Sequence, residues 1–507
     1  MKVLLTTLNS KYIHSNLALK CLFSVCTEGG YSIELKEFTT NNTEDYIFGE
    51  LLRGDYDVFC FSCYIWNIEL TLPLAENLKK AKPEAVIVLG GPEVSWRGPE
   101  IMKKHRAVDF ILAGEGEENL PVFLERLFSG DGEPGFEDIC GLHYRGEGKI
   151  FVNLPSEPAD INLLPFPYSK LISEADKIMY YESTRGCPFS CSYCISAIEK
   201  GMRALSVERV KSDLSYFIYK GVKQVKFVDR TFNYDNARAL EIIRYLMEND
   251  NGITNYHFEL CGDIISDELL EILPAARPGL FQFEIGVQST NPETLKSINR
   301  RCDFDLLFEN VNRIREMGNI HLHLDLIAGL PHENYQSFAA SFNHVYRMKP
   351  HMLQLGFLKL LPGTPIREEA EKYSYVFRSK APYEVISNSF ITAKELAKLK
   401  MVEMVFDLYY NRGGFENTLE YLSGAEGWEA FAFYENFADF YYSKGFQHKS
   451  HSKEDLYRIL HSYISSLDKD KQRVMGIAEL LLERDMEHCL NPEAIRKFTK
   501  IGWEMKP

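Results

Sequence analysis

The strongest constraint on the fold is a repeated alternation of short apolar runs with amphipathic stretches. Five such runs lie in the first 150 residues, beginning at Val3, Ile33, Val58, Ala85 and Phe110. This alternation predicts a parallel sheet wrapped by helices. Ligands of such sheets bind outside the carboxyl ends of the strands. We therefore expect a Rossmann-like (flavodoxin-like) α/β domain over residues 1–150, with its site on the loops that follow the strands.

A second series of six strand-like runs follows between residues 177 and 375. Between the two series, residues 151–176 contain Pro155, Pro158, Pro165 and Pro167. Because proline interrupts both helix and sheet, this segment is predicted to be an extended linker. Residues 376–507 lose the strand pattern and are predicted to form a helical C-terminal domain, in which Thr392 and Glu395 form a capping box.

Three cysteines occupy one short loop after the first strand of the second series. Cys187, Cys191 and Cys194 are separated by three and then two residues. Thiolates are soft ligands that select zinc, copper(I) or iron–sulfur clusters. Three ligands on so tight a loop leave a fourth metal position open. One interpretation is a zinc knuckle completed by His488 or Cys489, and the other is an iron–sulfur cluster.

The Cys-x3-Cys-x2-Cys loop after a first strand resembles the radical S-adenosylmethionine superfamily, and Tyr193 before the third cysteine also fits. The resemblance implies that the three cysteines hold three irons of a 4Fe–4S cluster. It implies that S-adenosylmethionine binds the fourth iron and is cleaved to a 5′-deoxyadenosyl radical. Six strand–helix units agree with that family's partial (β/α)6 TIM barrel, over residues 177–375, whose site lies at the carboxyl ends of the strands.

Further motifs follow in the order of that family, at the spacing of one strand and one helix. The resemblance implies that these positions contact S-adenosylmethionine, with Arg300 pairing the methionine carboxylate and Gly329 in a turn that flanks the adenine. Glu284 alternates inward on its strand and is expected to serve the ribose. For Asp229, support of a backbone turn beside the cluster stays an alternative, and ordinary capping of strand ends is the alternative for every position. The positions are Asp229, Glu284, Gln288, Arg300 and Gly329.

The first domain resembles the cobalamin-binding domain that precedes the barrel in one branch of this superfamily. The likeness lies in Gly90-Gly91-Pro92-Glu93 and Gly114-Glu115-Gly116-Glu117. A cobalt-ligating Asp-x-His-x-x-Gly is not matched, because Tyr12 and Leu17 stand at the Asp and Gly positions around His14. A flavodoxin-like domain with another ligand, or with none, is the alternative. The positions predicted to contact cobalamin are Ser62, Tyr64, Gly90, Gly91, Glu93, Gly114, Glu115, Gly116 and Glu117.

Composition limits the partners. The net charge of −15 disfavours a polyanion such as nucleic acid. No signal peptide and no apolar stretch of spanning length are recognised, and eleven cysteines without a secretory signal are typical of a reducing, cytoplasmic location. We expect a small-molecule or metabolite substrate, an external flavodoxin- or ferredoxin-like electron donor, and no membrane association.

The resemblance favours an enzyme that uses the 4Fe–4S cluster, S-adenosylmethionine and cobalamin to transfer a methyl group from methylcobalamin to a substrate radical on an unactivated carbon. Catalytic residues beyond the cysteines are not identified. Alternatives among enzymes are a radical rearrangement or cyclisation without methyl transfer, and RNA modification. From another class, a cobalamin- or cluster-binding sensor stays open.

Overall fold

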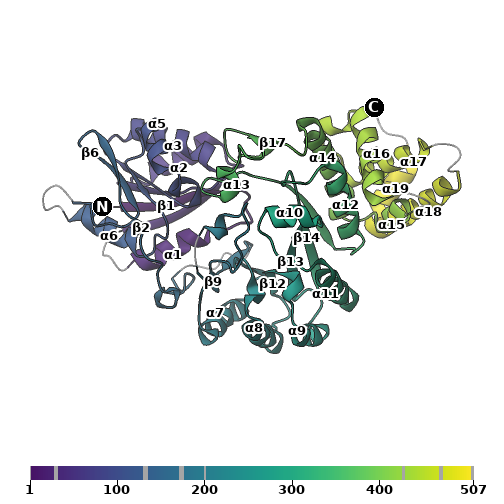
Figure 1. Ribbon diagram of the computed structural model, residues 1–507, viewed down its shortest axis with the longest axis horizontal. Helices are drawn as coiled ribbons and strands as arrows, with labels where there is room; N and C mark the ends of the chain where they lie inside the picture. The colour runs from purple at the N-terminus through teal and green to yellow at the C-terminus, as the bar shows by residue number, and fades with distance from the viewer. Residues whose placement is uncertain are drawn as a thin grey trace.

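The computed structural model describes residues 2–27, 32–129, 135–170, 176–198, 201–424, 429–467 and 472–503. Three parts follow one another along the long axis of the molecule (Figure 1). An α/β domain at the amino end, purple to blue, is followed by a central curved sheet with helices outside it, and by a helical part in yellow-green at the carboxyl end.

The first sheet has seven strands in the order β2-β1-β3-β4-β5-β6-β7. The first five are parallel, as predicted, with Leu5 of β1 opposite Leu35 of β2 and Cys60 of β3. The antiparallel pair β6 and β7 extends the sheet and was not predicted. The strands are β1 (Lys2–Asn9), β2 (Ser32–Thr39), β3 (Val58–Ser62), β4 (Val86–Gly90), β5 (Phe110–Leu112), β6 (Leu142–Gly146) and β7 (Lys149–Val152).

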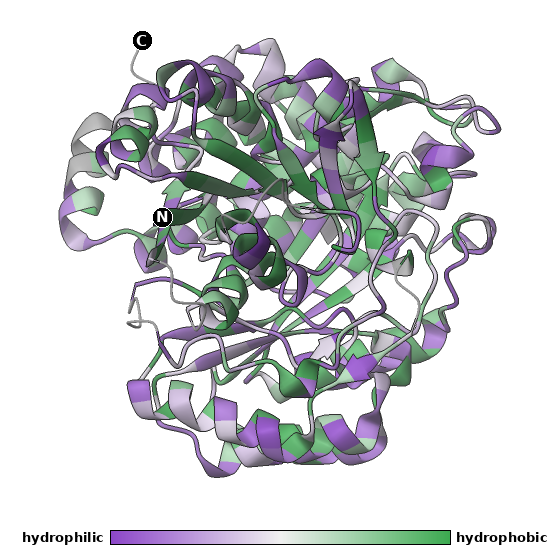
Figure 2. Cartoon of the chain, turned by 90° about the vertical axis from the view of Figure 1, so that its left-hand side faces the viewer, coloured by the Kyte–Doolittle hydropathy of each residue, from purple (hydrophilic) through white to green (hydrophobic). Residues whose placement is uncertain are grey.

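Helices cover both faces of this sheet, so its central strands are buried on both sides. Leu4 and Phe59 belong to one apolar cluster, whereas Val3 and Val58 belong to the cluster on the other face. In Figure 2 the strands are largely green, and the helices outside them carry purple segments. This burial explains why the strands are continuous apolar runs. The helices are α1 (Leu17–Cys26), α2 (Glu44–Arg53), α3 (Ile68–Ala81), α4 (Pro92–Ser95), α5 (Gly98–Lys104) and α6 (Asn119–Phe128).

The central part is the partial barrel that the sequence predicted. Its six parallel strands run in the order β15-β14-β13-β12-β11-β8. Along β13, Phe281, Phe283, Ile285 and Val287 are buried, and the alternate residues are partly exposed. The strands are β8 (Met179–Tyr181), β11 (Gln224–Phe227), β12 (Asn255–Leu260), β13 (Phe281–Gln288), β14 (His321–Ala328) and β15 (Met352–Phe357).

Helices on the outside of the barrel follow most of these strands (Figure 1). A small hairpin of β9 (Thr184–Arg185) and β10 (Arg203–Ala204) brackets the loop that contains the three cysteines. The helices are α7 (Val207–Lys220), α8 (Asn236–Glu248), α9 (Asp267–Ile272), α10 (Pro292–Ser297), α11 (Phe304–Met317), α12 (Tyr335–Tyr346) and α13 (Pro365–Glu368).

The carboxyl-terminal part is helical but begins with two short strands. The prediction that strands end before residue 376 was wrong, because β16 (Val376–Phe377) and β17 (Val385–Ser387) form an antiparallel pair. The capping box of Thr392 and Glu395 is confirmed at the start of α14. The helices are α14 (Ala393–Phe406), the π-helical turn η6 (Asp407–Asn411), α15 (Glu416–Gly424), α16 (Ala430–Ser443), α17 (Lys453–Ser465), α18 (Gln472–Cys489) and α19 (Pro492–Ile501).

The edge of the barrel at β15 is closed by one side chain of the helical part. The amide of Asn411 accepts from the backbone N–H of Leu353 at 3.0 Å and donates to its carbonyl at 3.1 Å. It thus replaces a neighbouring strand at an otherwise open edge. Barrel and helical part also share one continuous apolar core. Among the residues described, no helix has the length and apolar content needed to cross a membrane.

Candidate functional site

The cysteine loop connects β9 to β10 at the carboxyl end of β8. Cys191 is buried, whereas Cys187 and Cys194 are partly exposed. Burial raises the pKa of the Cys191 thiol, and the Arg300 guanidinium, whose Nη1 lies 3.8 Å from Sγ, opposes that rise. A positive group beside a thiol favours the thiolate, which is the form that binds metal.

The three thiols do not form a compact three-ligand group in this structure. A tetrahedral zinc site would place its sulfurs about 3.8 Å apart. In the described part of the chain, the sulfurs of Cys187, Cys191 and Cys194 do not all lie within 4.8 Å of one another. Cys489, proposed as a fourth zinc ligand, instead lies beside Gly414 and Lys453 in the helical part. The loop therefore fits a cluster whose irons each take one cysteine.

Asp229 binds the backbone turn that leads into the cysteine loop. Its carboxylate accepts from the backbone N–H groups of Ser183 and Thr184, at 2.7 and 3.1 Å, and from the Ser183 hydroxyl. The side chain is completely buried. Of the two roles predicted for Asp229, the structure supports the one on the backbone turn. Its contact with S-adenosylmethionine stays a prediction.

Arg300 lies beside Cys191, Gln288 and Arg300 both lie close to Gly286, and both side chains retain unused hydrogen-bonding capacity. Arg300 donates to the carbonyl of Gly286 and approaches Cys191, but its Nε is buried without a partner. Gln288, at the end of β13, has φ +70° and a buried Oε1 without a partner. A free donor and a free acceptor next to the open edge of the cysteine loop fit the carboxylate and ammonium groups of an amino acid.

Glu284 lies farther down the barrel. It is four residues before Gln288, about 13 Å along the strand. Its Oε2 accepts from Lys226 Nζ at 2.9 Å and from His257 Nε2 at 2.8 Å. Burial alone would raise the pKa of Glu284, but these two partners hold it at about 2. The predicted ribose contact therefore competes with two existing partners and stays a prediction.

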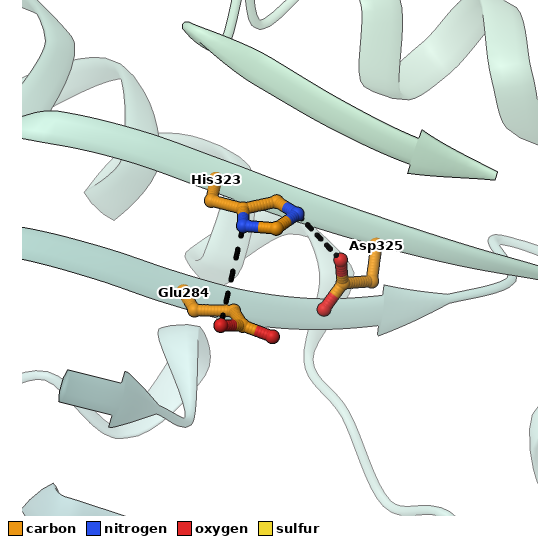
Figure 3. Close-up of side chains that lie close together, drawn as sticks. All are labelled: Glu284, His323 and Asp325. Carbon is orange, nitrogen blue, oxygen red and sulfur yellow. Dashed lines mark ion pairs between the residues drawn. The ribbon is translucent and has the colours of Figure 1, made fainter. Parts of the chain in front are cut away.

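The Glu284 carboxylate continues into a chain of charges on β14 (Figure 3). His323 Nδ1 lies 4.0 Å from Glu284 Oε2, and its Nε2 lies 3.1 Å from Asp325 Oδ1 without an aligned hydrogen bond. Within the described chain, these three residues are the one group of this kind whose ligand atoms lie within 4.8 Å. Because the imidazole stands between the two carboxylates and Lys226 already pairs Glu284, we interpret the group as an ion-pair chain.

Gly329 ends β14 in the turn predicted to flank the adenine. Its φ is +90°, and a Cβ there would lie 2.7 Å from Val385. Its carbonyl accepts from the Tyr375 hydroxyl and the Asn388 amide, both at 2.9 Å. The segment after the barrel therefore fixes this turn, and only glycine fits it. The adenine contact stays a prediction.

The predicted cobalamin edge is formed by the loops after β3, β4 and β5. Gly91 has φ +100°, and a Cβ would lie 2.7 Å from the Cys63 carbonyl, whereas Gly114 has φ +82° and open space around it. Ser62 is buried, and Tyr64 stacks on Trp66 at 4.4 Å. Gly90 and Gly116 continue the same loops, with a Cβ at 3.5 Å from Leu112 and 3.0 Å from Leu22. Gly91 thus lets two loops of this edge approach each other closely, and Gly114 leaves open space at the edge.

Exposed aromatic side chains at this edge were missed in the sequence. Tyr12, Trp66 and Trp96 follow β1, β3 and β4 and are 70%, 45% and 50% exposed. Their position directly after a strand was the available signal. His14, not predicted as a cobalt ligand, meets the hydroxyl of Tyr180 on β8 at 2.7 Å. A cavity of about 290 Å³ lies beside it, lined by residues of β1, β2, the loops that follow them and α2, and by Lys177.

The three acidic residues of this edge have partners in other parts of the chain. Glu93 accepts from the hydroxyl of Tyr383. Glu115 and Glu117 pair with Arg185 at 3.1 and 2.5 Å. Their side chains therefore point toward the barrel region instead of standing free at the sheet's edge, and their predicted contact with cobalamin stays a prediction.

Known protein families match three consecutive stretches of the chain. The B12 binding domain matches residues 3–124, and the Radical SAM superfamily matches residues 181–345. These ranges correspond to the first sheet and the partial barrel. The chain thus joins a B12 binding domain to a domain of the Radical SAM superfamily. Its cofactors are therefore a 4Fe–4S cluster, S-adenosylmethionine and cobalamin. Residues 371–499 match a protein of unknown function, DUF4080.

Individual relatives of this cobalamin-binding radical SAM protein are methyltransferases. It is 26% identical over 373 residues to the 2-(S-pantetheinyl)-carbapenam-3-carboxylate methyltransferase of Streptantibioticus cattleyicolor, covering 69% of this chain and 53% of that one. It is 26% identical over 324 residues to the hopanoid C-3 methylase of Methylococcus capsulatus, covering 62% and 60%. The chain thus spans about half the length of the carbapenam relative.

Solved structures share the fold of this radical SAM protein. The cobalamin-dependent S-adenosylmethionine radical enzyme OxsB superposes with a TM-score of 0.66 at 16% identity, covering 100% of this chain and 82% of that one. The radical S-adenosylmethionine methyltransferase TsrM from Kitasatospora setae gives 0.61 at 17% identity, covering 75% and 77%. The likeness to OxsB covers the whole chain and therefore includes both the first sheet and the barrel.

Proposed function

We propose that this protein is a cobalamin-dependent radical S-adenosylmethionine methyltransferase that methylates an unactivated carbon of a small-molecule substrate. The observation that carries the proposal is the contact between the two cofactor edges. Glu115 and Glu117, on the loop after β5, pair directly with Arg185, two residues before the first cysteine. A site at one edge is thereby adjacent to a site at the other, as transfer between two cofactors requires.

The roles of the chain's own residues follow from their positions. Cys187, Cys191 and Cys194 hold the cluster, and Arg300 and Gln288 offer the free donor and acceptor that orient an amino acid beside it. When bound, the cluster supplies the electron that cleaves S-adenosylmethionine, and cobalamin carries the methyl group. The polar inner wall of β12 to β14 faces the interior where the substrate binds. An external flavodoxin- or ferredoxin-like protein is the proposed electron donor.

The test uses full-length protein reconstituted anaerobically with iron, sulfide and hydroxocobalamin. With S-adenosylmethionine labelled in its methyl group and a chemical reductant, we expect 5′-deoxyadenosine together with label transferred to cobalamin. Each Cys→Ala variant of the trio should lower iron from about four per chain and abolish 5′-deoxyadenosine. Cys489→Ala is the matched control and should leave both unchanged. Unchanged iron and product in the trio variants would contradict the proposal.

Two alternatives are separated by the same assay. A rearrangement or cyclisation enzyme would form 5′-deoxyadenosine without moving the label, and a sensor would form neither product. RNA modification is named for more distant relatives, the tRNA-2-methylthio-N(6)-dimethylallyladenosine synthases, one of which is 25% identical over 302 residues. The net charge of −15 disfavours RNA as the substrate.

A further inference from the structure

The stem of the cysteine loop brings two like charges together. Arg185 of β9 and Arg203 of β10 stand directly opposite each other in the antiparallel pair. Like charges at such positions destabilise a strand pair. The stem is also tight, because a Cβ at Gly186 would lie 2.1 Å from the carbonyl of Gly201. The loop that carries the cysteines therefore needs a counter-charge to close in this form.

Glu182, three residues before Arg185, pairs with it at 2.8 Å, and the remaining counter-charge comes from the first domain. Glu115 Oε2 lies 3.1 Å from Arg185 Nη1 and 3.0 Å from Arg203 Nη1, so one carboxylate bridges both arginines. Glu117 binds Arg185 a second time at 2.5 Å. The side chains of Arg185 and Glu117 are only 11% and 9% exposed. Ion pairs so shielded from water are costly to break one partner at a time.

The same short loop also belongs to the edge predicted to bind cobalamin. Gly114 precedes Glu115 directly and has φ +82°, and a Cβ added there would meet nothing within 4 Å beyond its chain neighbours, whereas Gly116 packs on Leu22. One face of residues 114–117 is therefore open and the other is held by arginines of the cysteine loop. A ligand that fixes Gly114 also fixes Glu115 and Glu117 against the stem.

We propose that Glu115 and Glu117 are positioning residues for the cysteine loop, and that they couple cobalamin binding to occupation of the cluster site. Cobalamin binding and occupation of the cluster site each order the loop of residues 114–117. When one has taken place, the other therefore costs less conformational entropy. Coupling of this kind is reciprocal, so the same factor applies in both directions. The inference rests on the proposed function only in requiring both cofactors in one protein.

The primary experiment measures binding and not turnover. Full-length protein is prepared without a cluster and after reconstitution with iron and sulfide, and hydroxocobalamin is titrated into both by anaerobic equilibrium dialysis. We expect the cluster-loaded protein to bind hydroxocobalamin at least about fivefold more tightly. Equal Kd values for the two forms would overturn the proposal, whether or not any variant folds.

The variant Glu115→Gln/Glu117→Gln then tests the residues. We expect its ratio of Kd values to approach one, because the amides cannot neutralise Arg185 and Arg203. Loss of a direct contact with cobalamin would weaken binding to both forms equally and preserve the ratio, which would overturn the assignment. Glu118→Gln, an exposed neighbour, is the matched control and should keep the wild-type ratio. Absent methyl transfer with a preserved ratio would refute the proposed function alone.

Discussion

At the scale of single residues, the barrel interior contains a glutamate that is paired with two side chains of neighbouring strands. Lys226, His257 and Glu284 come from three adjacent strands and meet at one carboxylate oxygen. Burial raises the pKa of the neighbouring Glu259 to about 7, whereas the two donors keep that of Glu284 at about 2. Two glutamates opposite each other on β12 and β13 therefore differ because one has partners.

This contrast predicts a pH dependence of stability for Glu284. Its folded-state pKa of about 2 lies below the ordinary value of 4.5, so its stabilising contribution is complete above about pH 4.5 and is lost as the pH falls toward 2. Glu284→Gln should lower the free energy of unfolding by about 1–3 kcal/mol at pH 7 and by progressively less below pH 4.5. Urea titrations of wild type and variant, from pH 7 to below pH 4.5, measure this difference in the free energy of unfolding.

The comparison is made with Glu259→Gln. Burial raises the pKa of Glu259, so its ionised form is not stabilised by folding, and its removal should cost less at pH 7 than at pH 5. A penalty for Glu284→Gln that stays constant down to pH 3 would show that the ion pair with Lys226 does not contribute in the folded protein.

At the scale of elements, the edge at β15 depends on one amide. Asn411, in the turn η6, satisfies both backbone groups of Leu353, which is completely buried. A buried backbone group without a partner costs free energy comparable to a lost hydrogen bond. The partial barrel therefore ends at six strands without an open edge at this point.

Asn411→Ala should accordingly lower the free energy of unfolding by about 2–4 kcal/mol, because it leaves an N–H and a carbonyl without partners. Asn411→Asp keeps the acceptor for the Leu353 N–H and loses only the donor, so its cost should be smaller. Thermal and urea unfolding of both variants measure which of them loses more stability. An alanine variant as stable as the aspartate variant would contradict the role assigned to the amide.

The sequence sufficed for elements whose pattern is local. The continuous apolar runs of β1 and β3, the six barrel strands and the capping box at α14 all follow from neighbouring residues. The hairpin of β6 and β7 was missed because its strands are short and polar at their ends. Contacts between residues distant in the sequence, such as Glu115 and Arg203, could not be predicted either, since no local pattern specifies such a partner.

At the scale of the whole molecule, the first domain is held against the barrel region by buried polar contacts. Tyr383, before β17, donates its hydroxyl to Glu93 of α4, and Arg97 meets both groups. Burial raises the pKa of Glu93, and Tyr383 and Arg97 oppose the rise. Trp96 packs on the loop at Gly363, where a Cβ would lie 2.6 Å from the indole. These contacts between residues 93–97 and the segments around Gly363 and Tyr383 therefore fix one arrangement of the domains.

Tyr383→Phe should loosen this arrangement without disturbing either core. It removes one donor to a buried carboxylate, for an expected loss of about 1–3 kcal/mol. Limited proteolysis within residues 153–170, the described part of the linker, should be several-fold faster than in wild type. Tyr375→Phe is the matched control, because its hydroxyl donates to Gly329 within the barrel region. Equal cleavage of both variants would argue against the role of the Tyr383–Glu93 contact in holding the first domain against the barrel region.

The bridge from Glu115 to Arg185 and Arg203 has a consequence for biosynthesis. The amino end of a chain emerges from the ribosome first, and domains fold as units as they emerge. The carboxylates at positions 115 and 117 therefore leave the ribosome before the cysteines, and the arginine at position 203 follows them. The amino-terminal domain can therefore fold before the cysteine loop emerges, and its carboxylates are in place when the stem of that loop closes.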